Sequence, residues 1–235
     1  MRGPAWALVP IGSIVVVVFA IRYASGTADW LTWLALIAVP PLGAAALGWA
    51  IRGARPVFAL GAVPLFVIAW AFKTSLAGEA CGALLSALSC VTLGVLLASV
   101  TPARWLKLGI VLMAGADTWL VVSDILQAPN ATLVAAHPPA GLPQLQSVLF
   151  GSISFGYGDL FVAALLGAVL AGTPRLETRA AVLVLLVASA FDVLFAAVNE
   201  LPATVPVALV VIGLEVVSAG RRRSTRAGAT PRPAR

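Results

Sequence analysis

Eight apolar segments, each near the length that crosses a bilayer, limit what this chain can fold into. They cover residues 4–21, 30–51, 57–72, 80–101, 106–126, 145–171, 179–198 and 202–219. A transmembrane helix needs about 20 mostly apolar residues. Hydrophobic residues make up 61% of the 235 residues and charged residues only 10%, whereas soluble domains are about 25% charged. The pattern predicts an all-α polytopic membrane protein with about eight transmembrane helices.

Lysine and arginine gather at alternate ends of these segments. One side collects Arg2, Arg52, Arg55, Arg104, Lys107, Arg175, Arg179 and the six arginines of the C-terminal tail. The other side has only Arg22 and Lys73. Because cytoplasmic loops carry the excess of basic residues, both termini are expected to be cytoplasmic in the plasma membrane. Residues 127–144 then form an outer loop.

Three regions follow from this arrangement. Residues 1–101 would hold the N-terminal helices, residues 102–219 the four helices that carry most of the acids, and residues 220–235 a basic, disordered cytoplasmic tail. Such a tail favours anionic lipid head groups. The net charge of +6 lies in loops and tail, so it indicates the lipid bilayer and not nucleic acid. Residues 1–22 have an alternative interpretation as a cleaved signal, with Arg2 before an apolar core.

Acidic residues occur inside the apolar segments. An ionised Asp in hydrocarbon costs at least about 2.5–3.5 kcal/mol, so it is expected to face a partner, a water-filled cavity or a substrate. No basic residue is expected to pair with these acids inside the segments. For two of them, Asp192 and Glu215, a helix–helix hydrogen bond or a helix cap is favoured. The whole set is Asp117, Asp124, Asp159, Asp192 and Glu215.

Depth in the bilayer selects a pair among them. Asp117 lies 13 residues after Arg104, or about 20 Å along a helix. Asp159 lies 16 residues before Arg175, or about 24 Å by the same rise. The two carboxyls are therefore expected to face each other on adjacent antiparallel helices. Asp124, two turns further out on the same face as Asp117, is the fallback partner.

A pair of close carboxyls in a low-dielectric site has a specific chemistry. The two groups cannot both ionise, so they share a proton. The ionised member takes a proton from water while the protonated member polarises a carbonyl, which suits peptide hydrolysis. No metal or organic cofactor is needed for this reaction, and one outer-loop His with scattered acids predicts no metal site.

Three motifs in order resemble those of the presenilin and signal peptide peptidase family of intramembrane aspartyl proteases. Gly156-Tyr157-Gly158-Asp159 matches the family's Gly-x-Gly-Asp motif. Pro202-Ala203-Thr204 resembles its Pro-Ala-Leu motif two helices later, with Thr204 in place of Leu. The first motif is usually Tyr-Asp and here reads Ala116-Asp117, or Ser123-Asp124. The resemblance covers residues 105–219.

The resemblance implies a presenilin-like catalytic half with Asp117 and Asp159 as the catalytic pair. It implies that Gly156, Tyr157 and Gly158 lie beside the substrate. Pro202, Ala203 and Thr204 would shape the site and receive an extended substrate strand. The expected orientation is similar to that of signal peptide peptidase, which implies type II transmembrane segments as substrates. The altered first and third motifs, and eight helices where the family has nine, leave an inactive relative as an alternative.

Other functions remain open from the same residues. Ser154 to Asp159 is close to a potassium-channel filter, but only about a dozen apolar residues follow Asp159, too few for an inner helix. Prepilin peptidases share Gly-x-Gly-Asp, but Phe161 occupies the position of their usual lysine. A proton- or cation-coupled transporter that uses the buried acids as a relay is the main non-enzyme alternative. The oligomeric state is not predicted.

Overall fold

The structure is a computed structural model, and it describes residues 12, 16, 18–21, 26–125, 127–136, 138, 141–151, 153–196 and 201–227. The first expected span, residues 4–21, lies mostly outside the described residues. The question whether residues 1–22 are a cleaved signal lies there as well. Residues 228–235 of the expected tail are also outside them.

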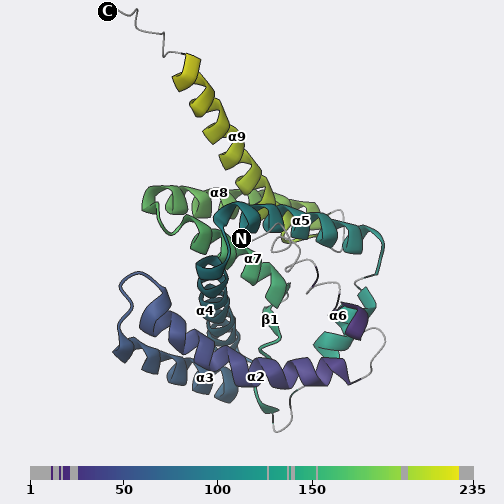
Figure 1. The fold of residues 1–235 in the computed structure, drawn as a ribbon. Coiled ribbons are helices and arrows are strands. Elements are labelled where there is room, and N and C mark those ends of the chain that lie inside the picture. Colours follow the sequence, from purple (N-terminus) through teal and green to yellow (C-terminus); the bar gives the residue numbers. More distant parts are fainter. Residues whose placement is uncertain are drawn as a thin grey trace, which may run out of the picture.

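The described chain is all-α apart from one short hairpin (Figure 1). Its first half contains α2 (Thr27–Ala45), η2 (Ala46–Ala50), η3 (Pro56–Gly61), α3 (Ala62–Ala71) and α4 (Leu76–Val100). Its second half contains α5 (Ala103–Val122), α6 (Gln127–Ala135), β1 (Ser147–Phe150), β2 (Ile153–Gly156), α7 (Tyr157–Leu170), α8 (Pro174–Asp192), η5 (Val193–Ala196) and α9 (Val205–Ala227). The all-α prediction is confirmed at this level.

The number of spans differs from the prediction. Within the described residues, three helices are long and apolar enough to cross a bilayer, and not eight: Thr27–Ala50, Leu76–Val100 and Ala103–Val122. Large apolar side chains on them, such as Ile37 and Val122, are exposed, as lipid contact would require. These helices indicate a multi-pass membrane protein. Shorter apolar helices cover Pro56–Ala71, Tyr157–Leu170 and Val205–Gly220.

Local interruptions explain the difference. The expected span over 145–171 is broken by the antiparallel pair β1–β2, whose turn contains Gly151 at φ +61°, so α7 has only 14 residues. In place of the expected span over 179–198, α8 begins earlier, at Pro174, and carries Arg175, Glu177 and Arg179 near its start. The expected outer loop over 127–144 contains α6. Hydropathy alone does not reveal any of these features.

Helix α4 lies between two packed groups of helices (Figure 1). On one side it contacts α2 and α3, and on the other it contacts α7. Glycines make both approaches close. A Cβ on Gly43 of α2 would lie 2.8 Å from a methyl of Leu85 on α4, and one on Gly94 of α4 would lie 3.2 Å from the Ala164 backbone of α7. Small residues at such crossings let helix backbones pack tightly in a membrane protein.

Two hydrophobic clusters correspond to the two helix groups. The larger one is formed by α5, α7, α8 and α9 around Ile110, Leu165 and Val211. The smaller one joins α2, α3 and α4 around Val39 and Leu85. Helix α9 continues through Ala227, into the segment from residue 220 onward for which the sequence predicts a disordered tail. Arginine and alanine are good helix formers, and basic residues favour a helix C-terminus.

We expect Gly94→Ala to destabilise the fold by about 1–3 kcal/mol, because the new methyl would press on the α7 backbone, which cannot move aside as a flexible side chain can. Gly167→Ala on α7 is the matched control, since a Cβ there meets nothing within 4 Å and alanine favours helix by up to about 1 kcal/mol. Unfolding of the two purified variants in detergent, followed by circular dichroism, measures the difference. A Gly94→Ala protein as stable as wild type would contradict the close α4–α7 packing.

Candidate functional site

Three elements distant in sequence bring Asp117, Asp159 and Thr204 together. Asp117 lies on α5, Asp159 on α7, and Thr204 directly precedes α9. The Thr204 hydroxyl donates a hydrogen bond to Oδ2 of Asp117 at 2.6 Å. Asp159 lies within electrostatic range of Asp117, since α7 packs against α5. The structure therefore brings together the two acids that the sequence selects, with one residue of the third motif added.

The position of Asp159 follows from how α7 begins. Gly156 is the N-cap in an extended conformation, and its N–H donates to Asp159 Oδ2 at 3.0 Å. Asp159 is therefore the third residue of the helix and supplies half of a capping box, since glycine has no side chain to return the bond. A carboxylate here also meets the positive end of the helix dipole. One carboxyl oxygen of Asp159 serves this cap.

The two glycines of the motif have different surroundings. A Cβ on Gly156 would lie 3.1 Å from Asp159 Oδ2, so a side chain there would crowd the cap. A Cβ on Gly158 would meet nothing within 4 Å. Both residues are exposed. The described structure thus leaves open space beside Gly158, within one residue of the Asp159 backbone.

The Tyr157 side chain lies in the contact between α7 and α4. Its hydroxyl lies 2.7 Å from the Ser89 hydroxyl, and its carbonyl accepts a weak bond from the Cys90 thiol at 3.7 Å. Ser89 already donates to the Ser86 carbonyl, so the Tyr157 hydroxyl is the donor in the first contact. Tyr157 fixes the start of α7 on α4. Its expected contact with substrate stays a prediction.

Asp124 does not take part in this arrangement. It follows the end of α5 in a left-handed conformation with φ 57°, and it is exposed. Its Oδ1 accepts a hydrogen bond from the Gln127 side chain at 2.8 Å. The expectation that it continues the helical face of Asp117 is wrong, because α5 ends at Val122.

The remaining acids of the apolar segments are spread apart. Glu215 on α9 forms an ion pair with Lys107 on α5 at 2.5 Å. This corrects the expectation that no basic residue pairs with these acids, and it agrees with a helix–helix role for Glu215. Asp192 is the last residue of α8 and is exposed.

The third motif approaches the pair through its last residue. Pro202 and Ala203 are half-buried in the segment before α9, and the Pro202 carbonyl accepts from the Val205 N–H at 3.2 Å. Thr204 is 2% exposed. Thr204 thus provides a hydroxyl that contacts Asp117. The substrate-binding roles of these three residues remain predictions.

Metal ligands do not gather among the described residues, where no group of three or more His, Cys, Asp or Glu could hold an ion. Comparison with known proteins gives no further assignment: no family model, curated protein or solved structure matches the chain. The assignment of a function to the candidate site therefore rests on the geometry of the site.

Ser89 is the residue of this region that sequence reasoning missed. It is fully buried and holds the start of α7. The signal is weak but present, because Ser86 and Ser89 lie three residues apart on one face of an apolar helix. Polar side chains on such a face commonly hydrogen-bond to a neighbouring helix.

We expect Tyr157→Phe and Ser89→Ala each to destabilise the protein by about 0.5–1.5 kcal/mol, the usual net worth of one hydrogen bond. The double variant should cost less than the sum, because both single changes remove the same bond. Unfolding of the four proteins in detergent gives the coupling energy. Strict additivity would show that the two hydroxyls do not bond.

Proposed function

We propose that the protein is an intramembrane aspartyl protease that hydrolyses peptide bonds within transmembrane segments. The observation that carries this proposal is the proximity of Asp117 and Asp159, two half-buried carboxyls from different helices that pack together. The resemblance of three ordered motifs to the presenilin and signal peptide peptidase family supports it. The bond from Thr204 to Asp117 adds support, since it joins the third motif to the first.

The chemistry follows from what two such carboxyls do. In a low-dielectric site they share one proton, since two adjacent negative charges repel. The ionised member removes a proton from a water molecule, which attacks the scissile carbonyl. The protonated member hydrogen-bonds to that carbonyl oxygen and stabilises its developing negative charge. The Thr204 hydroxyl orients one oxygen of Asp117, and the Gly156 N–H orients one oxygen of Asp159.

We infer that the substrate approaches through the open space beside Gly158. A transmembrane substrate must unwind before its peptide bond can be attacked, and its freed backbone groups need partners inside the bilayer. The β1–β2 hairpin leads directly into α7, and in the described chain it is a sheet of only two strands. An extended substrate can add to such an edge by backbone hydrogen bonds. The expected partners are therefore transmembrane peptides or membrane-protein segments, favoured in the type II orientation.

The proposed location is the plasma membrane with both termini cytoplasmic. Contacts between loops agree with this orientation. Arg52, from a loop expected inside, donates to the Ala171 carbonyl at 2.5 Å and pairs with Glu177 at 2.6 Å, next to another loop expected inside. Lys73, expected outside, donates to the Gly141 carbonyl at 3.3 Å in the segment expected outside.

Asparagine variants separate catalysis from structure. Asp159→Asn keeps an oxygen for the Gly156 N–H, and Asp117→Asn keeps one for the Thr204 hydroxyl, but neither can share a proton with its partner. We expect both to fold and to lose cleavage by at least about a thousandfold, because an amide can replace neither the base nor the acid. The assay is cleavage of labelled type II transmembrane peptides by purified protein in liposomes, with mass spectrometry of the products.

Asp124→Asn and Asp192→Asn are the matched controls, because each removes one carboxylate from an exposed position, and both should retain near-normal cleavage. Cleavage by the Asp159→Asn protein at the wild-type rate would contradict the proposal. A folded wild-type protein that cuts no peptide would favour an inactive relative or a proton- or cation-coupled transporter, which flux measurements in the same liposomes would separate.

A further inference from the structure

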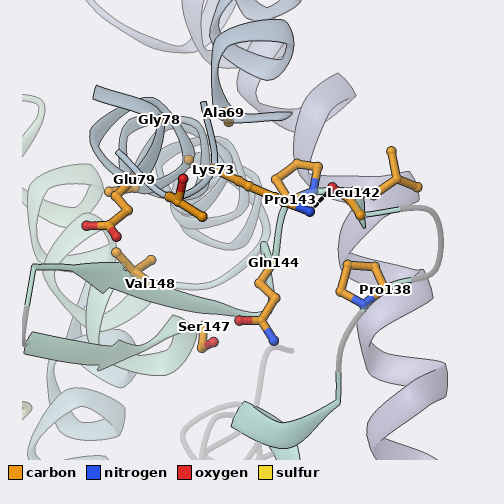
Figure 2. A pocket seen from close by; sticks show the side chains of 14 residues that line it. Ala69, Lys73, Gly78, Glu79, Pro138, Leu142, Pro143, Gln144, Ser147 and Val148 are labelled. Atoms are coloured by element: carbon orange, nitrogen blue, oxygen red, sulfur yellow. Dashed lines mark hydrogen bonds between the residues drawn. The ribbon is translucent and has the colours of Figure 1, made fainter. Parts of the chain in front are cut away.

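Glu79 joins the start of α4 to the turn of the β1–β2 hairpin. It is half-buried in the first turn of α4, and its Oε2 accepts a hydrogen bond from the Gly151 N–H at 2.8 Å. Gly151 lies 72 residues further along the chain, in the turn between the two strands. Figure 2 shows the Glu79 side chain directed from α4 toward the strand that carries Val148. The bond therefore ties the turn end of the hairpin to α4.

The backbone from which Glu79 extends is held in place. Ser75 caps α4, since its hydroxyl accepts from the Gly78 N–H at 3.2 Å and its carbonyl accepts from the Glu79 N–H at 3.0 Å. A Cβ on Gly78 would overlap the Phe72 carbonyl oxygen, so the end of α3 packs directly against this turn. Glu79 is therefore a fixed point for whatever its carboxylate binds.

The hairpin connects that fixed point to the acid pair. Its turn has two residues, because Phe150 pairs with Ile153, and Gly151 takes the left-handed conformation with φ +61° that such turns need. The pairing continues to Gly156, five residues and about 17 Å from Gly151 at the usual rise of a strand. Gly156 is the N-cap whose N–H binds Asp159. A movement of the turn is thus carried along β2 to the residue that orients Asp159.

Apolar packing holds the turn end of the hairpin only in part. A cavity of about 350 Å³ lies between the start of α4 and β1 (Figure 2). Glu79 and Gly82 line it on the α4 side, and Val148 lines it on the β1 side. Atoms beside a void lose the contacts that would otherwise hold them, whereas a hydrogen bond to an ionised acceptor is among the strong ones. The bond from Gly151 to Glu79 therefore matters more here than it would beside a filled contact.

A second attachment lies at the other end of the hairpin. Tyr157, which directly follows β2, is bound to Ser89 on α4. Glu79 and Ser89 are ten residues apart on the same helix, or about 15 Å. A rod fixed at one point can pivot about it, and a second fixed point removes that freedom. Glu79 and Ser89 together therefore set both the position and the direction of β2 along α4.

We propose that Glu79 is a positioning residue of the candidate site. Its bond to Gly151 keeps the hairpin from pivoting about Tyr157 and so holds Gly156 where its N–H orients Asp159. The inference rests on the proposed function, because the orientation of Asp159 affects a rate only where this acid takes part in hydrolysis. The property that matters is the reach of the Glu79 side chain to Gly151, and not its charge.

Hydrogen exchange of glycine amides, followed by NMR of the full-length protein labelled with ¹⁵N-glycine, measures this role without a substrate. Glu79→Ala removes the acceptor. Glu79→Asp keeps the charge at the helix start but is one methylene too short, and Glu79→Gln keeps the reach without the charge. We expect the Gly156 amide to exchange at least about tenfold faster than wild type in the Ala and Asp variants, and within about twofold of wild type in Glu79→Gln.

Two controls separate this local effect from a general one. Asp29→Ala removes another acid from the first turn of a helix, in this case an exposed one on α2, and should leave the Gly156 rate unchanged. The Gly167 amide in α7 should keep its rate in every variant. Equal acceleration at Gly156 and Gly167 would overturn the proposal. So would an Asp variant that behaves as wild type while Glu79→Gln does not, since charge would then be the property that matters.

Cleavage of labelled transmembrane peptides in liposomes connects the position of Asp159 to the chemistry. Glu79→Ala and Glu79→Asp should lower kcat and kcat/KM together by at least about tenfold, the pattern of an interaction lost in the transition state. Glu79→Gln should restore both. A rise in KM alone would assign Glu79 to substrate binding and overturn its positioning role. A wild-type protein that cuts no peptide would remove the proposed function, and the exchange rates alone would then decide whether Glu79 positions Gly156.

Discussion

The interaction between Asp117 and Asp159 depends on where α7 begins. A carboxyl in the middle of an apolar helix would have only hydrocarbon around it. Asp159 instead stands in the first turn of α7, where the Gly156 N–H binds one of its oxygens and the helix dipole favours its charge. The β1–β2 hairpin ends at that point, and Tyr157 fixes it to α4 through Ser89. The same features lower the free-energy cost of burying the Asp159 carboxylate and position Asp159 near α5.

Asp159 can therefore cap α7 and also serve in the proposed acid pair. A capping carboxylate needs one oxygen, and a member of an acid pair needs the other. The second acid, Asp117, is held in a similar way, since Thr204 binds its Oδ2. Each carboxyl therefore has at least one oxygen that a hydrogen bond from the protein orients. Preorganised groups of this kind would favour the proposed hydrolysis, because their orientation need not change during the reaction.

The proximity of Asp117 and Asp159 is expected from the sequence, whereas the shape of the chain around them is not. Counting 1.5 Å per residue from Arg104 and Arg175 is enough to put Asp117 and Asp159 at similar depth. Residues 145–171 read as one apolar run, but short apolar runs do not distinguish strand from helix, and the turn at Gly151 depends on backbone freedom that hydropathy ignores. The sequence also places Asp124 on the helix of Asp117, because no proline marks the end of α5 at Val122. The Lys107–Glu215 ion pair depends on the packing of α5 against α9. These helices are distant in sequence, so the sequence alone does not indicate the pair.

The central claim is that Asp117 and Asp159 hold one proton between them. Infrared spectroscopy of protein labelled with ¹³C at the Asp carboxyls, reconstituted in liposomes at neutral pH, observes it directly, because a protonated carboxyl has a stretching band separate from that of a carboxylate. The account predicts one protonated Asp band that disappears in Asp117→Asn and in Asp159→Asn and persists in Asp124→Asn. A spectrum with every Asp ionised, or a band that only one of the first two variants removes, would contradict it.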